Sequence, residues 1–328
     1  MGFFQPHVAA NPAGVSLVGK TAIVTGASSG LGLATAQQLL DIGVSTLVLA
    51  VRNISKGEQV KHDLLATTSA TSASDVRVMQ IDMADPKSVL AFANQVRTAF
   101  ATLDILILNA GLGMEPTFNT SAAGHELIMQ INYHSNVLLI LELLPLLESG
   151  SNASRITWIG SRMMHFRSPL RTAKPAEPLA WLDQAVNCKK FFRYQESKLV
   201  AAMFLYEFAA RLDPLKVQIN MMCPGMVITN LEAHGTPFIV RVLVGVVKRI
   251  RGRTTADGAA LIMHSAVYAG PETHGKFLGD ATVEPLDDFI ASNDGQKMQQ
   301  TVWTESLGDA LKHISEERRS DVSQLLSK

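Results

Sequence analysis

The sequence contains few of the residues that mark secreted, metal-binding or nucleic-acid-binding proteins. Its 328 residues include two cysteines, Cys188 and Cys223, which form no Cys-x-x-Cys pair and no metal-ligand spacing. This usage fits a reducing compartment better than a disulfide-stabilised secreted protein. Basic and acidic residues number 29 each, so the net charge of 0 gives no case for nucleic acid as a partner.

The sequence also lacks a long hydrophobic run. The longest, VLLILELLPLL at residues 137–147, contains Glu142 and Pro145 and falls short of the roughly 20 residues that a membrane-spanning helix needs. Residues 1–17 have no basic start and no long apolar core, so they do not form a signal peptide. We therefore expect no transmembrane segment and a cytoplasmic location, with peripheral contact with an intracellular membrane as the alternative.

Strand-like apolar runs alternate with helical patterns along most of the chain. Strands are expected at residues 21–26, 45–51, 76–82, 103–111, 154–161 and 216–225, and helices at 31–43, 56–67, 86–100 and 125–148. This alternation predicts an α/β fold, a single doubly wound parallel sheet (Rossmann fold) with helices on both faces. We expect an N-terminal arm at 1–17, one catalytic domain at 18–283 with an active-site insertion at 162–190 and a substrate lid at 230–253, and a C-terminal helical tail at 284–328.

The segment TGASSGLG, residues 25–32, joins the first expected strand to the first expected helix. Its glycines, Gly26, Gly30 and Gly32, permit a tight turn whose backbone N–H groups approach a phosphate at the positive end of a helix. A plain glycine-serine turn is the alternative. The position between a first strand and a helix favours dinucleotide binding.

Arg52 and Asn53 follow the second expected strand, where an NAD site would place an acidic residue for the ribose 2′-hydroxyl. Arginine suits a 2′-phosphate because it forms charge-assisted hydrogen bonds with phosphate oxygens. The alternative is an ordinary surface arginine. The sequence therefore favours NADPH/NADP over NAD as the cofactor.

Tyr194 and Lys198 are one helical turn apart, which brings their side chains together. Of the four tyrosines, Tyr194 alone has a lysine at the fourth following position. Upstream, Ser161 ends an expected strand and Asn132 lies in the expected helix at 125–148. A tyrosine packed by its ring and a surface lysine are the alternatives, so the spacing alone leaves their roles open.

Taken in order, these motifs resemble those of the short-chain dehydrogenase/reductase family. The resemblance rests on TGASSGLG, on IDM with Asp82 and Met83, on NAG at 109–111, on Asn132, Ser161, Tyr194 and Lys198, and on CPGMVIT at 223–229. It extends from about residue 20 to about residue 280. Within the family, the chain is most similar to retinol-dehydrogenase-like reductases and to fungal reductases of secondary metabolism. It departs from the family in having Gly160 before Ser161 and a longer interval from Ser161 to Tyr194.

The resemblance implies a set of cofactor contacts and a catalytic group. The cofactor contacts are Gly26, Ser28, Ser29, Gly30, Leu31, Gly32, Arg52, Asn53, Asp82, Met83, Asn109, Ala110, Gly111, Tyr194, Lys198, Pro224, Gly225, Val227 and Thr229. Tyr194 is the implied general acid, and Lys198 is the cation that lowers the pKa of Tyr194 and binds the nicotinamide ribose. Ser161 is the implied donor to the carbonyl oxygen, and Asn132 holds a water. This chemistry requires no metal.

The expected partner is a small hydrophobic carbonyl or alcohol substrate. Candidate substrate contacts are Met163, His165, Phe166, Phe192 and Met226. The apolar residues of the insertion could equally pack it onto the domain. Residues 236–253 are apolar and then basic, a pattern that fits either a lid over the substrate or a membrane-surface helix. We favour the lid, because the segment directly follows the expected cofactor contact Thr229. The resemblance also suggests a homodimer through the helices at 125–148 and 194–212.

Together these features predict NADPH-dependent reduction of an apolar ketone or aldehyde, with alcohol oxidation as the reverse reaction. One alternative is a non-redox cyclisation or isomerisation in the same pocket. Another is an NADP-binding sensor or scaffold without turnover. The complete set of Ser161, Tyr194, Lys198 and Asn132 argues against the sensor, because a protein that only binds needs no proton relay.

Overall fold

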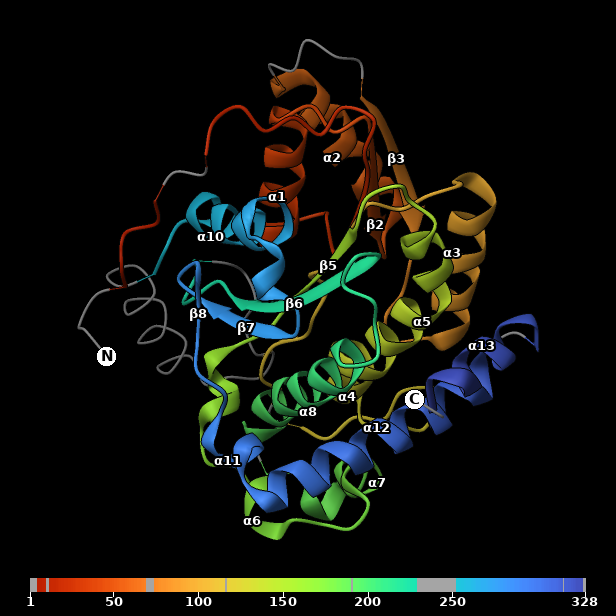
Figure 1. The fold of residues 1–328 in the computed structure, drawn as a ribbon, viewed down its shortest axis with the longest axis vertical. Coiled ribbons are helices and arrows are strands. Elements are labelled where there is room, and N and C mark those ends of the chain that lie inside the picture. Colours follow the sequence, from red (N-terminus) through yellow and green to blue (C-terminus); the bar gives the residue numbers. More distant parts are fainter. Residues whose placement is uncertain are drawn as a thin grey trace.

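The computed structural model describes residues 5–9, 12–68, 74–115, 117–189, 191–228, 252–314 and 316–326. These residues form a twisted eight-stranded sheet between two layers of helices (Figure 1). The strands are β1 (Thr21–Thr25), β2 (Thr46–Val51), β3 (Asp75–Gln80), β4 (Ile105–Leu108), β5 (Ser154–Ile159), β6 (Val217–Cys223), β7 (Lys276–Gly279) and β8 (Thr282–Val283). Their order is β3-β2-β1-β4-β5-β6-β7-β8, and all neighbours are parallel except β7 and β8. The predicted doubly wound α/β fold is confirmed.

The strand order reverses between β1 and β4. The chain runs outward from β1 to β3 and then returns to place β4 on the other side of β1. Ligands of doubly wound sheets bind outside the carboxyl ends of the strands at this switch point. The central strands are buried on both faces, which explains why their sequences are continuous apolar runs.

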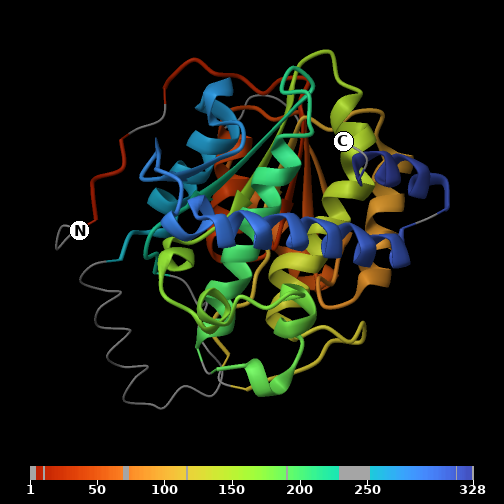
Figure 2. The ribbon, with the colours of Figure 1, turned by 60° about the horizontal axis from the view of Figure 1, so that its bottom comes forward.

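Two layers of helices cover the sheet. Helices α1 (Gly30–Asp41), α2 (Ile54–Thr67) and α10 (Thr255–Met263) pack against one face, and α3 (Pro86–Ala99), α5 (Ser135–Glu148) and α8 (Phe192–Ala209) pack against the other. Successive residues of β1 alternate between the layers: Ala22 and Val24 belong to the first core and Ile23 to the second. Figure 2 shows α5 and α8 running side by side in front of the sheet.

The stretch predicted as one helix at 125–148 has three parts. A short helix α4 (Leu127–Met129) passes into a π-helical turn η1 (Gln130–His134), which continues as α5. The π-turn contains Asn132, and turns of this kind are frequent at functional sites. Leu127–Glu148 is long and apolar enough to cross a membrane, but 89% of its most apolar window is buried inside the protein, as expected of a core helix.

The insertion at 162–190 consists of short helices. These are η2 (Arg162–His165), α6 (Pro169–Ala173), α7 (Pro178–Leu182) and η3 (Ala185–Asn187). Met164, Leu170, Leu179 and Leu182 are buried in the main core. Part of the apolar content of the insertion therefore packs it onto the domain.

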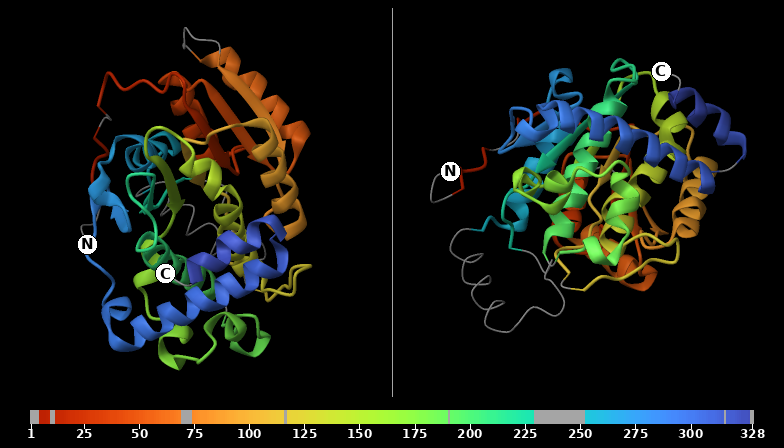
Figure 3. Two further views of the ribbon diagram at one scale, coloured as in Figure 1. Left: turned by 45° about the vertical axis from the view of Figure 1, so that its right-hand side comes forward. Right: turned by 90° about the horizontal axis from the view of Figure 1, so that it is seen from below.

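The C-terminal tail lies across the outer side of the α5–α8 layer. It contains α11 (Asp288–Ala291), the long helix α12 (Asn293–His313) and α13 (Glu316–Leu326), and α12 crosses over α8 and α5 (Figures 2 and 3). Trp303 of α12 is 3% exposed and packs against Phe204 and Phe208, with ring centroids 5.3 and 6.3 Å apart. The helices expected to form a dimer are thus covered by this chain's own tail.

Candidate active site

The glycine loop lies between β1 and α1, at the switch point of the sheet. Gly26 and Gly30 have φ angles of 69° and 57°, which glycine adopts without strain. A Cβ on Gly32 would lie 2.5 Å from the carbonyl oxygen of Gly26, so only glycine allows this approach of helix and loop. Within the described chain, Ser29 makes no side-chain cap and the first turn of α1 has no acidic residue. The first N–H groups of α1 are left for an anion.

Thr25, which was not among the predicted site residues, joins this loop to the end of β4. Its hydroxyl accepts hydrogen bonds from the backbone N–H groups of Asn109 and Ala110 at 3.0 and 2.9 Å. The Asn109 amide donates in return to the carbonyl oxygen of Thr25 at 2.8 Å. The loops after β1 and β4, which carry TGASSGLG and NAG, are therefore held together. Thr25 is the last residue of β1 and directly precedes the glycine loop, and this position was the feature of the sequence that could have identified it.

The residues proposed for the adenosine end lie at the carboxyl ends of β2 and β3. Arg52 is exposed, and its side chain forms no ion pair with any residue that the structure describes. Asn53 caps α2 by accepting a hydrogen bond from the Lys56 N–H at 2.9 Å. Asp82 accepts one from the Ala84 N–H at 2.9 Å, and Met83 is 5% exposed. Asn53 thus has a structural role that its predicted cofactor role does not exclude.

Tyr194, Lys198 and Ser161 come together where α8 meets the end of β5. The Lys198 Nζ lies 5.6 Å from the centroid of the Tyr194 ring and donates a hydrogen bond to the carbonyl oxygen of Ile159 at 2.8 Å. Ser161 is the N-cap of η2, where its hydroxyl accepts a hydrogen bond from the Met163 N–H at 3.2 Å. The longer interval between Ser161 and Tyr194 does not separate them, because the insertion folds as an excursion between β5 and α8.

Burial dominates the ionisation of this group. It raises the pKa of Tyr194 to about 12; the neighbouring Cys223 acts in the same direction and a hydrogen bond with Ser161 opposes it. Burial lowers the pKa of Lys198 to about 8. The protein alone therefore keeps Tyr194 protonated, which is the form that a proton donor needs.

Asn132 is held by three hydrogen bonds. Its Oδ1 accepts from the Leu112 N–H at 2.7 Å, and its Nδ2 donates to the Leu112 carbonyl at 3.0 Å and to the Ser197 hydroxyl at 3.1 Å. Ser197 donates in turn to the Tyr194 carbonyl at 2.7 Å. Asn132 is fully buried and ties the loop after β4 to the turn of α8 that carries Tyr194 and Lys198. Ser197, inside the Tyr-x-x-x-Lys interval, was not singled out from the sequence.

The Pro-Gly segment follows β6. Gly225 has a φ of 79°, Val227 is 7% exposed, and the Cys223 thiol accepts hydrogen bonds from the N–H groups of Arg162 and Gly225, both at 3.4 Å. This places the thiol between the serine loop and the Pro-Gly segment. The predicted contact Thr229 and nearly all of the predicted lid at 230–253 lie outside the described residues.

The predicted substrate residues differ in environment. Phe166, Phe192 and Met226 are 55%, 37% and 43% exposed, and Met163 is half-buried. His165 instead forms ion pairs with Asp287 at 2.7 Å and Glu284 at 3.7 Å. Its hydrogen bonds with Asp287 and Glu284 raise its pKa to about 9. His165 is therefore bound to carboxylates of the C-terminal segment, in addition to its predicted role as a substrate contact.

A buried arginine precedes Tyr194. Arg193 is 2% exposed, donates to Glu196 at 2.9 Å and lies 3.8 Å from Glu126. Glu196 also accepts a hydrogen bond from the Leu170 N–H at 2.9 Å, which ties α8 to the insertion. Charged residues usually lie on the surface, so nothing in the sequence indicated that Arg193, Glu196 and Glu126 are buried.

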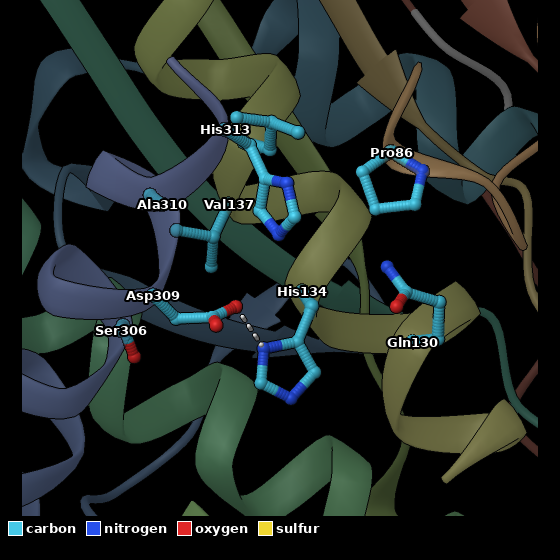
Figure 4. Close-up of a pocket in the computed structure, with 9 residues that line it drawn as sticks. Pro86, Gln130, His134, Val137, Ser306, Asp309, Ala310 and His313 are labelled. Atoms are coloured by element: carbon cyan, nitrogen blue, oxygen red, sulfur yellow. Dashed lines mark ion pairs between the residues drawn. The ribbon is translucent and has the colours of Figure 1, made fainter. Parts of the chain in front are cut away.

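His125 and His134 form a second polar cluster, and His134 and Asp309 line a small hollow (Figure 4). His125 pairs with Asp183 at 2.7 Å and Asp309 at 3.1 Å, and His134 with Asp309 at 3.2 Å. The two imidazole rings stack 3.8 Å apart at 12°. An ion about 2 Å from a nitrogen of each ring would have to lie near both ring planes, which this stacking opposes. The arrangement is that of a hydrogen-bonded cluster joining the insertion to α12.

The comparisons with known proteins identify the family. A sequence profile described as short chain dehydrogenase matches residues 20–173. The chain is 43% identical over 321 residues to the short chain dehydrogenase macD of Penicillium terrestre, covering 94% of this chain and 96% of that protein. It is 40% identical over 316 residues to the short-chain dehydrogenase/reductase tropG of Talaromyces stipitatus, covering 93% and 95%. The chain belongs to the short-chain dehydrogenase/reductase family, as predicted, and is an oxidoreductase of that family.

Solved structures agree on the fold. The Pseudomonas aeruginosa RhlG/NADP complex matches with a TM-score of 0.61 and 22% identity, covering 80% of this chain and 95% of that chain. YwfH, described as an NADPH-dependent reductase involved in bacilysin biosynthesis, matches with a TM-score of 0.57 and 22% identity, covering 81% and 100%.

Proposed function

We propose that the protein is a cytoplasmic NADPH-dependent reductase of an apolar ketone or aldehyde, which also oxidises the corresponding alcohol. The observation that carries the proposal is the grouping of Tyr194, Lys198 and Ser161 at the carboxyl end of β5, on the sheet edge that also carries the glycine loop. The relatives from Penicillium, Aspergillus and Talaromyces support a place in fungal secondary metabolism.

The residues present fit a dinucleotide. The close approach of Gly32 to Gly26 and the uncapped start of α1 form a cradle for a pyrophosphate, which a side chain at Gly32 would fill. Arg52, which is exposed and forms no ion pair with the described residues, would hold the 2′-phosphate of NADPH. When bound, the nicotinamide supplies the hydride.

The protein's own groups carry the proton. Tyr194, kept protonated by burial, donates its hydroxyl proton to the carbonyl oxygen as negative charge develops there. Ser161 donates a hydrogen bond to the same oxygen. Lys198, fixed by the Ile159 carbonyl, places a positive charge beside the tyrosinate that results. The exposed Phe166, Phe192 and Met226 supply apolar surface for the substrate.

The test is to follow NADPH consumption with a panel of hydrophobic ketones and aldehydes. Tyr194→Phe should lower kcat by about 10² to 10⁴, the usual contribution of a general acid. Tyr206→Phe is the matched control, because Tyr206 lies on the same helix and burial also raises its pKa to about 12. Equal rates for wild type and Tyr194→Phe would refute the proposed acid. Product formation without NADPH consumption would indicate a non-redox cyclase or isomerase. NADPH binding without turnover would indicate a sensor or scaffold.

A further inference from the structure

The turn between β7 and β8 has an unusual backbone. Asp280 and Ala281 are consecutive non-glycine residues in the left-handed region, with φ angles of 53° and 62°. L side chains adopt this conformation at a cost and keep it only where the surroundings hold it. Asp tolerates this region better than most residues do. The contacts of the Asp280 side chain therefore help to hold the turn in this conformation.

The Asp280 carboxylate bridges two arginines. Its Oδ2 accepts a hydrogen bond from Arg162 Nη2 at 2.7 Å, and its Oδ1 lies 2.6 Å from Arg253 Nη2. The side chains of Asp280, Arg162 and Arg253 are 17%, 26% and 6% exposed, so the ion pairs are shielded from solvent. The two arginines come from segments 91 residues apart in the chain. Asp280 is the group that joins them.

The first arginine belongs to the serine loop. Arg162 directly follows Ser161, and its Nε donates a second hydrogen bond to Glu284 at 2.6 Å. A Cβ on Gly279 would lie 2.3 Å from Arg162 Nη2, so the glycine leaves room for the arginine to reach Asp280. A shift of Asp280 would therefore move the residue next to the proposed oxyanion donor.

The second arginine supports the Pro-Gly segment. Arg253 Nη1 donates to the Pro224 carbonyl at 3.3 Å, and the Arg253 N–H donates to the Met226 carbonyl at 2.8 Å. A Cβ on Gly225 would lie 2.6 Å from Arg253 Nη1, so the guanidinium packs directly under the glycine. Asp280 thus reaches the segment proposed to contact the nicotinamide.

These three loops follow β5, β6 and β7, which are adjacent and parallel, so the loops lie at the same sheet edge. We propose that Asp280 is a positioning residue that sets the separation of the Ser161 loop and the Pro224–Gly225 segment. The kinetic consequence rests on the proposed function; the spacing itself does not. The Cys223 thiol, hydrogen-bonded to both the Arg162 and Gly225 N–H groups, lies where the spacing is set and reports on it.

Asp280→Asn is the informative variant, because asparagine tolerates a positive φ and removes only the charge. Asp104→Asn is the matched control. Asp104 is also 17% exposed and is paired with Lys20 at 2.7 Å, but it precedes β4, at the opposite edge of the sheet. Both changes remove the charge of one half-buried carboxylate, but only Asp280→Asn acts on the site.

The first measurement needs neither cofactor nor substrate. In a Cys188→Ser background, which leaves Cys223 as the single thiol, Asp280→Asn should speed the reaction of Cys223 with a small thiol reagent by about tenfold or more. Asp104→Asn should change it by less than twofold. Equal rates in the two variants would overturn the proposal.

The second measurement is kinetic. Asp280→Asn should weaken NADPH binding by about 3- to 10-fold and lower kcat by about tenfold, at a Tm matching that of Asp104→Asn. A loss that simply follows Tm in both variants would show that Asp280 stabilises the fold without positioning the site. If the wild type binds neither NADPH nor NADH, the proposed function fails, and the thiol rates alone decide the role of Asp280.

Discussion

The ammonium group of Lys198 donates a hydrogen bond to the carbonyl oxygen of Ile159 at 2.8 Å, in the last residue of β5. Ile159 is two residues before Ser161, so this contact holds the buried ammonium group of Lys198 close to the serine. Burial lowers the pKa of Lys198 to about 8. The charge on which the proposed proton transfer depends is therefore lost just above physiological pH.

We predict that kcat/KM for carbonyl reduction is level below pH 8 and falls about tenfold per pH unit well above it, because the neutral lysine no longer stabilises the tyrosinate. The measurement is a pH profile in the range where circular dichroism shows folded protein. Lys198→Arg stays charged throughout, so its residual activity should show no fall near pH 8. The same fall in this variant would exclude Lys198 as its source.

Arg52 should determine the choice of cofactor. Arg52→Asp replaces a cation with an anion that repels a 2′-phosphate and can accept a hydrogen bond from a ribose 2′-hydroxyl. We expect the ratio of kcat/KM for NADPH to that for NADH to fall at least about 10- to 100-fold, the value of one charge-assisted hydrogen bond. Lys87→Asp, at an exposed lysine of α3, is the control for net charge. An unchanged ratio in Arg52→Asp would place the 2′-phosphate elsewhere.

Much of this arrangement could be predicted from the sequence, and the exceptions have physical reasons. The strands β1, β2 and β4 are largely apolar runs, whereas β3, β5 and β6 mix polar with apolar residues. Strands β7 and β8, of four and two residues, lie in a stretch interrupted by Gly279 and Asp280, so no apolar pattern marks them. The π-turn at Asn132 depends on how backbone hydrogen bonds shift, which side-chain periodicity does not encode.

The buried charges were the other exception. Arg193, Glu126 and Arg253 are in sequence indistinguishable from surface residues, and their pairing depends on segments brought together by the fold. Thr25 and Ser197 lie within motifs that were singled out, yet their hydrogen bonds depend on tertiary neighbours. Motifs thus indicated the candidate site, whereas the contacts that hold its residues in place required the structure.

The tail should be essential for stability. Trp303→Ala removes a 3% exposed ring that packs against Phe204 and Phe208, and should lower the free energy of unfolding by about 3–5 kcal/mol. Trp181→Ala, at a half-buried tryptophan of α7, should cost less. Urea unfolding of both variants is the measurement, and equal losses would mean that α12 contributes little to the core.

The same packing bears on the oligomeric state. Because α12 covers α5 and α8, the face through which the resemblance suggests a homodimer is occupied, and we predict a monomer for the full chain. A chain ending at Val283 would expose this apolar face and should self-associate. Light scattering after size-exclusion chromatography distinguishes these cases. A dimeric full chain and an unchanged truncated chain would contradict the prediction.

The His125 cluster predicts a stability that falls at alkaline pH. Burial lowers the pKa of His125, but hydrogen bonds and charges of Asp183 and Asp309 outweigh it and raise the pKa from 6.5 to about 9. The folded protein thus binds this proton more tightly than the unfolded chain does. Its contribution to the free energy of unfolding, about 1–3 kcal/mol, is fully present below pH 6.5 and is lost as the pH rises through 9.

The measurement compares wild type with His125→Gln, which keeps a hydrogen-bonding side chain but cannot be charged, by urea unfolding between pH 6 and 10. His165, whose pKa is also about 9, and Lys198 titrate in the same window in both proteins, so their contributions cancel in the difference. The remaining pH dependence belongs to His125 and to His134, whose pKa the charge on His125 lowers. The wild type should be the more stable at pH 6, and the difference should shrink toward pH 10. A difference independent of pH would mean that the imidazole stabilises the cluster by packing and hydrogen bonding, without its charge.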